Sequence, residues 1–330
     1  MEDSRSESLR LSQYVDWDLA QHWVQDLAER RMNKHNMFLS PKALEDVRVI
    51  DVERGNIDHL PPNSQYVALS YVWKVEAGQV QSTMSSLQRL RKPGSLNQFQ
   101  LSQTVTDAMT VCKELKYRYL WIDRLCICQD DASYQKSRKL DQMASIYNQA
   151  ALAIVAAVGA DADYGLVGVS RPRLPKQRML KLTQNFQLVE CVQNLDFSLF
   201  HSRWRSRGWT YQEHIAPSTI FFFTNDGLHM QRGHGKYRET FSEGPVEDPE
   251  SSYGTENIVL AMVEEYTQRK LTYDDDIIRA FSSLSMRKRL LSAYHRMTLT
   301  AQCYGNQVIS TLRLENPRQR IPSRPGLGHP

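Results

Sequence analysis

The stretch YVALSYVW, at residues 66–73, is rich in apolar, β-branched and aromatic residues and predicts a buried strand. The same pattern returns in YLWID at 119–123 and in ALAIVAAVGA at 151–160. Between these runs, residues 102–116 and 133–150 carry apolar side chains at helical spacing. Buried strands that alternate with helices in this way are typical of an α/β fold with a parallel sheet.

Polar side chains stand where the first two of these strands end. Ser70 and Tyr71 follow the first apolar run, and Asp123 and Arg124 follow the second. Because the carboxyl ends of parallel strands share the sheet edge at which open α/β sheets bind ligands, we expect these groups to lie close together. A third block, SRWRSRGWTYQE, ends in Glu213. We expect Ser70, Asp123 and Glu213 to border one crevice at that edge.

The flanking regions carry patterns of their own. Residues 15–27 space their apolar side chains as a helix does, and DVRVIDVE at 46–53 alternates as a strand does. Residues 242–256 are rich in Pro, Ser, Gly and acidic residues and predict a loop, whereas 257–284 return to helical periodicity. We therefore expect an N-terminal helical and strand extension at 1–60, a core domain at 61–215, C-terminal strands and helices that complete the domain at 216–315, and a disordered tail at 316–330.

The composition is that of an ordinary globular protein, with 41% hydrophobic and 24% charged residues among 330. The net charge is +4 and the basic residues are dispersed, so we expect no nucleic-acid partner. The polar N-terminus lacks the apolar segment of a secretory signal, and no window approaches about 18 uninterrupted apolar residues. We therefore expect a soluble cytoplasmic protein without a membrane partner.

The cysteines predict neither disulfides nor a metal site. Five scattered cysteines in a chain without an export signal are expected to be reduced thiols. Cys126 and Cys128 form a Cys-x-Cys pair that has no second Cys or His pair nearby, which is poor evidence for zinc. The chain also has no Gly-rich phosphate loop, no GxSxG and no HExxH, so we expect no bound cofactor.

Several sequence blocks follow one another in the order seen in a single fungal family. They are LSYVW at 69–73, YLWIDRLCICQ at 119–129, the helical pattern of Met143, Ile146, Tyr147 and Ala150, SRGWTYQE at 206–213, and YTQRKLTYDDDIIRAFSSL at 266–284. Together they resemble the heterokaryon-incompatibility (HET) domain. Lys74 departs from the family, which has glycine after the tryptophan of the first block, so the loop that leaves this strand is expected to differ in shape.

The HET family is in turn similar to the Toll/interleukin receptor (TIR) fold, a flavodoxin-like, mostly parallel sheet flanked by helices. In catalytically active TIR domains, a Trp-x-x-x-Glu motif supplies the glutamate that cleaves NAD. Trp209 and Glu213 have this spacing. The resemblance therefore implies that Glu213 is catalytic, that NAD is a small-molecule substrate and that the protein forms a homo-oligomer.

The candidate site has one catalytic residue and six substrate-binding residues. Glu213 would stabilise the oxocarbenium-like charge that develops when the N-glycosidic bond of NAD breaks. The substrate-binding candidates are Ser70, Tyr71, Trp73, Asp123, Arg124 and Trp209.

Each candidate also has a structural interpretation. Glu213 could cap a helix or pair with Arg207 instead. Asp123 could form an ion pair with an arginine of the third block, and Trp73 and Trp209 could be core residues. The residues leave both interpretations open.

Three classes of function agree with these observations. The first is a HET protein that acts in fungal non-self recognition and programmed cell death, through NAD cleavage. The second is a self-associating signalling module without catalysis. The third is a biosynthetic enzyme of secondary metabolism that uses the same crevice for another small molecule.

Overall fold

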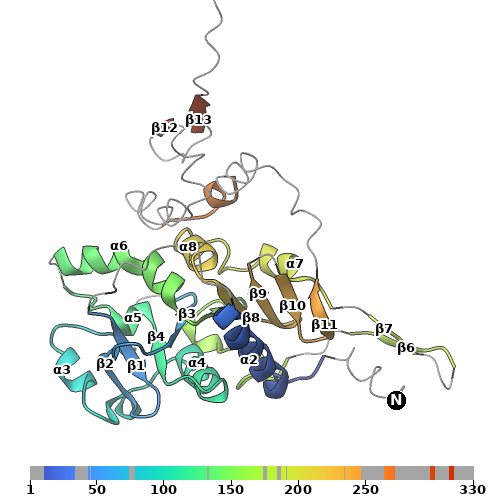
Figure 1. Ribbon diagram of the computed structural model, residues 1–330, viewed down its shortest axis with the longest axis horizontal. Helices are drawn as coiled ribbons and strands as arrows, with labels where there is room; N and C mark the ends of the chain where they lie inside the picture. Colours follow the sequence, from blue (N-terminus) through green and yellow to red (C-terminus); the bar gives the residue numbers. More distant parts are fainter. Residues whose placement is uncertain are drawn as a thin grey trace, which may run out of the picture.

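The computed structural model gives the arrangement of most of the first 246 residues and of three short segments that follow (Figure 1). The described residues are 11–33, 44, 46–73, 79–131, 134–173, 177–183, 187–190, 192–233, 235–246, 264–271, 298–301 and 312–315. Lys74 and the tail 316–330, for which we made predictions, lie outside them.

Four parallel strands form the centre of the sheet: β3 (Tyr66–Ser70), β4 (Tyr119–Trp121), β5 (Leu152–Ala156) and β8 (Thr219–Thr224). The first three lie where the apolar runs predict strands, and nearly all of their side chains are buried. Their order in the sheet is β8-β5-β3-β4, so the first strand lies between the second and the third. This is the flavodoxin-like order, which places a topological switch point between β3 and β5.

The two crossover helices cover opposite faces of these strands. α4 (Gln103–Glu114) connects β3 to β4, and α6 (Tyr134–Gln149) connects β4 to β5. Because the two right-handed crossovers run in opposite directions along the sheet, their helices fall on its two sides (Figure 1). α6 is fixed to the sheet by the Tyr147 hydroxyl, which donates a hydrogen bond to the Leu69 carbonyl at 2.9 Å.

Antiparallel strands extend both edges of the parallel centre. β1 (Arg48–Asp51) and β2 (Asn56–His59) continue the sheet beyond β4. Beyond β8 follow β9 (Gly227–Arg232), β10 (Gly235–Arg238) and β11 (Phe241–Val246), which completes a nine-stranded mixed sheet among the described residues. The predicted α/β class is confirmed, with its parallel pairing confined to the four central strands.

β11 corrects one prediction. We expected residues 242–256 to form a loop, but 242–246 pair with β10 as the last strand of the sheet. The segment SEGPV reads as a loop because it contains Gly and Pro. At an edge strand one side has no partner strand, so proline is tolerated there. Residues 247–256 lie outside the described part of the chain.

The N-terminal helix α2 (Trp17–Asn33) packs on the same core as the sheet. The Trp23 ring meets Phe221 of β8 edge to face, with centroids 5.9 Å apart, and lies 6.4 Å from the ring of Tyr237 in β10. The helix predicted near the N-terminus is therefore present and covers part of the antiparallel edge of the sheet (Figure 1).

The remaining elements are short and lie between or after these strands. They are α3 (Leu87–Leu90), η1 (Ser95–Gln98), α5 (Asp123–Cys126), η2 (Ala162–Tyr164), β6 (Met179–Lys181), β7 (Gln187–Val189), α7 (Leu195–Phe200), α8 (Trp209–Ile215), β12 (Thr298–Ala301) and β13 (Leu312–Glu315). Of the predicted helix at 257–284, only 264–271 are described, and their first four residues are helical. Among the described residues, no helix combines the length and apolar character needed to cross a bilayer.

Candidate active site at the carboxyl edge of the parallel strands

Ser70 and Glu213 meet at the end of β3. The Ser70 hydroxyl donates a short hydrogen bond to Oε2 of Glu213 and accepts one from Nε1 of Trp204 at 2.6 Å. All three side chains are buried. The indole N–H therefore polarises the hydroxyl that reaches the carboxylate, because successive hydrogen bonds strengthen one another where the dielectric constant is low.

Glu213 is held in this position by the turn that precedes α8. The Thr210 hydroxyl donates to the Trp204 carbonyl at 2.6 Å and accepts a hydrogen bond from Nη1 of Arg269 at 3.1 Å. Gly208, just before α8, packs so closely on Leu271 that a Cβ there would lie 2.3 Å from a methyl carbon of that side chain. The block SRGWTYQE thus folds as a tight turn followed by the short helix α8. This arrangement brings the Glu213 side chain to Ser70 at the end of β3.

Asp123 lies next to this pair, at the start of α5. Its Oδ2 accepts a hydrogen bond from Nε1 of Trp73 at 2.8 Å, and its Oδ1 accepts one from the backbone N–H of Arg124 at 2.6 Å. Burial raises the pKa of Asp123, while the Trp73 indole and the Arg124 amide oppose that rise. Trp73 is therefore a hydrogen-bond donor to a half-buried carboxyl group as well as a partly buried residue packed against the core.

The two carboxyl groups influence each other. Burial raises the pKa of Glu213 to about 7, the negative charge of Asp123 adds to the rise, and the Ser70 hydroxyl and the charges of Arg207 and Arg269 oppose it. The expected convergence of Ser70, Asp123 and Glu213 at one sheet edge is therefore seen. Ser70 and Glu213 are buried, and Asp123 is half-buried beside them. Glu213 is only 6% exposed, so it does not line an open crevice.

Tyr71, Arg124 and Trp209, the remaining candidates, differ in how deeply they are buried. Arg124 is buried, and its guanidinium carbon lies 5.3 Å from the centre of the Trp73 ring. Tyr71 is buried beside it, and burial keeps the pKa of its hydroxyl well above the usual value. Trp209, the first residue of α8, is half-buried against the core. The structure thus places all seven candidates around the ends of β3 and β4 and the start of α8.

For two candidates the structure shows which contacts their side chains make. Glu213 is the fifth residue of α8, so it caps no helix N-terminus, and its hydrogen bond goes to Ser70. Asp123 is hydrogen-bonded to an indole and a backbone amide. Its link to the third block is the electrostatic attraction of Arg207, which lowers the pKa of Asp123.

Trp204 is the member of the centre that sequence reasoning did not single out. It lies in the same block as Glu213, but a tryptophan in such a block is usually assigned to the core. Trp204 does pack on Phe222, with ring centroids 5.9 Å apart. Its indole N–H nevertheless donates to the Ser70 hydroxyl. A buried tryptophan N–H usually needs an acceptor, and this requirement is the signal that could have identified Trp204.

The centre offers carboxyl groups, hydroxyl groups and indole donors, but no metal-binding cluster. Among the described residues, no group of three or more His, Cys, Asp or Glu side chains is arranged to hold a metal ion. Two neighbouring carboxyl groups in different surroundings can divide acid and base roles or stabilise a developing positive charge. This is the chemistry available at the carboxyl edge.

Comparison with known proteins gives a match to a family model. Residues 66–213 match the model of the family described as heterokaryon incompatibility protein (HET), and this range begins with β3 and ends at Glu213. No curated protein and no solved structure shows a significant match to the chain. The protein therefore carries a heterokaryon-incompatibility domain, which spans residues 66–213.

Proposed function

We propose that this protein acts in fungal non-self recognition and programmed cell death, and that the Glu213 centre cleaves NAD. The observation that carries the proposal is the contact between Glu213 and Ser70 at the end of β3, beside the topological switch point of the sheet. The match to the HET family supports the biological role. The Trp-x-x-x-Glu spacing of Trp209 and Glu213 supports the reaction.

The proposed reaction breaks the bond between C1′ of the ribose and the nicotinamide nitrogen. The bonding electrons leave with nicotinamide, and positive charge develops on the ribose. An ionised Glu213 would stabilise that charge, and the hydrogen bond from Ser70 helps to keep Glu213 ionised. Water then adds at C1′ and loses a proton, which gives ADP-ribose. Because Glu213 is buried, substrate entry requires side chains around it to move.

The test is incubation of the purified protein with NAD, followed by chromatographic detection of nicotinamide and ADP-ribose over a range of pH. The pKa of Glu213 is raised to about 7 and its ionised form is the active one in this proposal. We therefore expect kcat/KM to rise as the pH passes through about 7 and then to level off. No nicotinamide at any pH would exclude the reaction.

A second candidate function is self-association without catalysis, and the β6–β7 hairpin favours it. Leu180 and Leu188 are cross-strand partners, so they lie on the same face of this two-stranded sheet. Their side chains are 59% and 57% exposed. A two-stranded sheet is marginally stable alone, and a second copy of the chain that covers this face would stabilise it.

Light scattering at increasing protein concentration tests self-association. We expect a concentration-dependent dimer or larger assembly, and we expect Leu188→Ser to weaken it at least about tenfold, because it removes half of the cross-strand apolar pair. Exclusively monomeric protein at high concentration would contradict this function, as would an assembly that Leu188→Ser leaves unchanged.

We also propose a cytoplasmic location. The observation in its favour is that Cys112, Cys126 and Cys128 are buried free thiols. Thiols remain reduced in the cytosol, whereas secreted proteins of this size commonly contain disulfides. Fluorescence microscopy of the tagged protein in fungal cells would test the location.

A further inference from the structure

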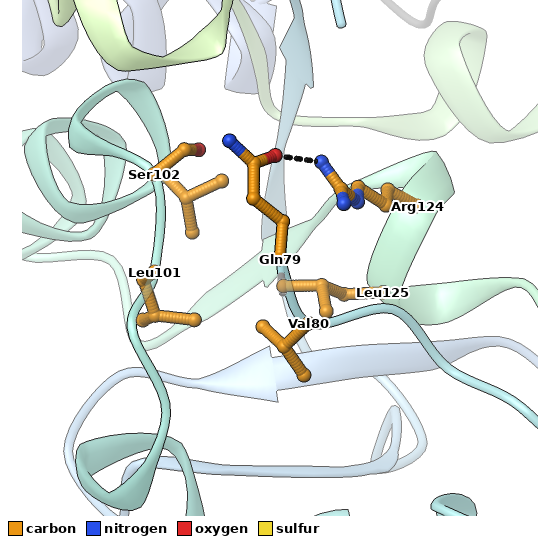
Figure 2. A pocket seen from close by; sticks show the side chains of 7 residues that line it. Gln79, Val80, Leu101, Ser102, Arg124 and Leu125 are labelled. Atoms are coloured by element: carbon orange, nitrogen blue, oxygen red, sulfur yellow. Dashed lines mark hydrogen bonds between the residues drawn. The ribbon is translucent and has the colours of Figure 1, made fainter. Parts of the chain in front are cut away.

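We propose that Arg124 is the centre of a recess that binds an oxyanion, such as the phosphate or carboxylate group of a small molecule. The recess is lined by Gln79, Val80, Leu101, Ser102, Val105, Arg124 and Leu125 (Figure 2). Arg124 directly follows Asp123 in α5, and the proposal does not require Glu213 to cleave NAD.

Arg124 presents an unused pair of donors in a buried position. Its side chain is 3% exposed, and Nε and Nη2 have no hydrogen-bond partner among the described residues. These two N–H groups lie on one edge of the planar guanidinium and point in the same direction. That edge can donate two parallel hydrogen bonds to the two oxygens of one carboxylate or phosphate group.

The rest of the guanidinium is fixed by its neighbours. Nη1 donates a hydrogen bond to Oε1 of Gln79, and the group stacks over the Trp73 ring. The amide nitrogen of Gln79 in turn donates to Oδ2 of Asp163 at 3.0 Å. Arg124 is thus held in one orientation before any ligand binds, which reduces the entropy lost on binding.

The charge of Arg124 is also not neutralised by an ion pair. No carboxylate oxygen of the described residues lies within 4.0 Å of its guanidinium nitrogens. Asp123, the adjacent residue, directs its oxygens to Trp73 and to the backbone amide of Arg124. A buried cation without a partner is costly, and an anionic ligand would remove that cost.

Two further groups favour an anion at this place. The buried Tyr71 hydroxyl lies beside the Arg124 guanidinium. Burial raises the pKa of Tyr71, so the group stays protonated and able to donate. Ser102, the N-cap of the 12-residue helix α4, lines the recess without capping the helix with its side chain. The positive end of this helix therefore faces the same space.

The recess is small. Its enclosed volume is about 10 Å³, which is room for one water-sized group. We therefore expect one of the two oxygens bonded by Arg124 to enter the recess, and the other to lie at its mouth with the remainder of the ligand. Figure 2 shows Gln79 between Ser102 and Arg124, with its oxygen directed at the guanidinium.

The experiment measures the melting temperature of the full chain in inorganic phosphate and, separately, in acetate. Potassium chloride at the same ionic strength is the reference. At about ten times its Kd, the anion should raise the Tm of the wild type by roughly 3 °C. A rise in phosphate alone identifies a phosphate site, and a rise in acetate alone identifies a carboxylate site. No rise in either anion overturns the proposal.

Three variants locate the binding. Arg124→Lys keeps the charge but loses the pair of parallel donors, and it should lose most of the rise. Tyr71→Phe keeps the ring and should weaken the Kd about fivefold, which also tests the recess if Arg124→Lys does not fold. Arg91→Lys changes an exposed arginine that pairs with Asp58 at 3.7 Å, and it should respond as the wild type does. An equal rise in wild type and Arg124→Lys would show that the anion binds elsewhere.

Discussion

The Ser70 hydroxyl donates its hydrogen bond to Glu213 across 143 positions of sequence, and so it joins the end of β3 to the middle of α8. The same hydroxyl accepts the indole N–H of Trp204. One small side chain therefore connects the two ends of the span that matches the HET family model, 66–213, at a place where α/β sheets bind ligands.

Replacement of Ser70 tests this connection energetically. Ser70→Ala leaves the buried Trp204 N–H without an acceptor and removes a donor from Glu213. We expect the free energy of unfolding to fall by about 1–3 kcal/mol, measured by urea denaturation. Ser206→Ala changes an exposed serine whose hydroxyl bonds the Arg203 carbonyl, and it should cost less than about 0.5 kcal/mol. Equal losses in the two variants would show that the Ser70 contacts contribute little.

The pKa of Glu213 predicts how stability depends on pH. Its folded pKa is about 7, above the unfolded value of 4.5, so the folded state binds the proton more tightly. The contribution of this group is fully present below pH 4.5 and is lost as the pH rises through 7. The difference amounts to roughly 3 kcal/mol, at 1.36 kcal/mol for each pKa unit.

The comparison variant for this prediction is Glu213→Gln, which cannot titrate. The free energy of unfolding of the wild type should decrease relative to this variant between pH 4.5 and 7, the two pKa values of Glu213. Subtraction of the two curves removes the effects of titrating groups that do not interact with Glu213, such as His229. Parallel curves would mean that the pKa of Glu213 is not raised by folding.

A buried ion pair attaches the N-terminal segment to the sheet. Nη1 of Arg173 lies 2.8 Å from Oε2 of Glu239, and the side chains are 1% and 6% exposed. The other oxygen of Glu239 accepts the backbone N–H of Asp16 at 2.7 Å. Arg173→Met would leave the carboxylate buried and unpaired, and we expect a loss of about 3–5 kcal/mol in urea denaturation.

The control for Arg173 is a surface ion pair with the same separation. Nζ of Lys236 lies 2.8 Å from Oδ2 of Asp196, whose side chain is 64% exposed. Lys236→Met should therefore cost no more than about 1 kcal/mol. A similar small loss for Arg173→Met would contradict the role given to the buried pair.

The sequence was most informative where apolar residues form short uninterrupted runs. β3, β4 and β5 lie in uninterrupted apolar runs, so their strands and the helices between them could be predicted. β11 could not, because its Gly and Pro indicate a loop and its pairing with β10 is a tertiary effect. Local propensity does not report such pairing.

The candidate site, too, could be predicted from the sequence only in part. The carboxyl ends of parallel strands share an edge of the sheet, so the placement of Ser70 and Asp123 could be expected from topology. The expectation for Glu213, which lies in α8, rests on the resemblance. The part played by Trp204 could not be expected, because the choice between a core tryptophan and a hydrogen-bond donor depends on where one N–H points. The unpartnered Nε and Nη2 of Arg124 likewise become visible only when its neighbours are placed.

The most direct test of the account compares NAD turnover and melting temperature in wild type, Glu213→Gln and Glu264→Gln, which changes an exposed residue. The account predicts nicotinamide release by the wild type and by Glu264→Gln. In Glu213→Gln it predicts a loss of about 10²–10³ in rate, with the protein still folded, because the amide lacks the charge that opposes the oxocarbenium ion. Wild-type protein that releases no nicotinamide, or a folded Glu213→Gln that retains the wild-type rate, would contradict it.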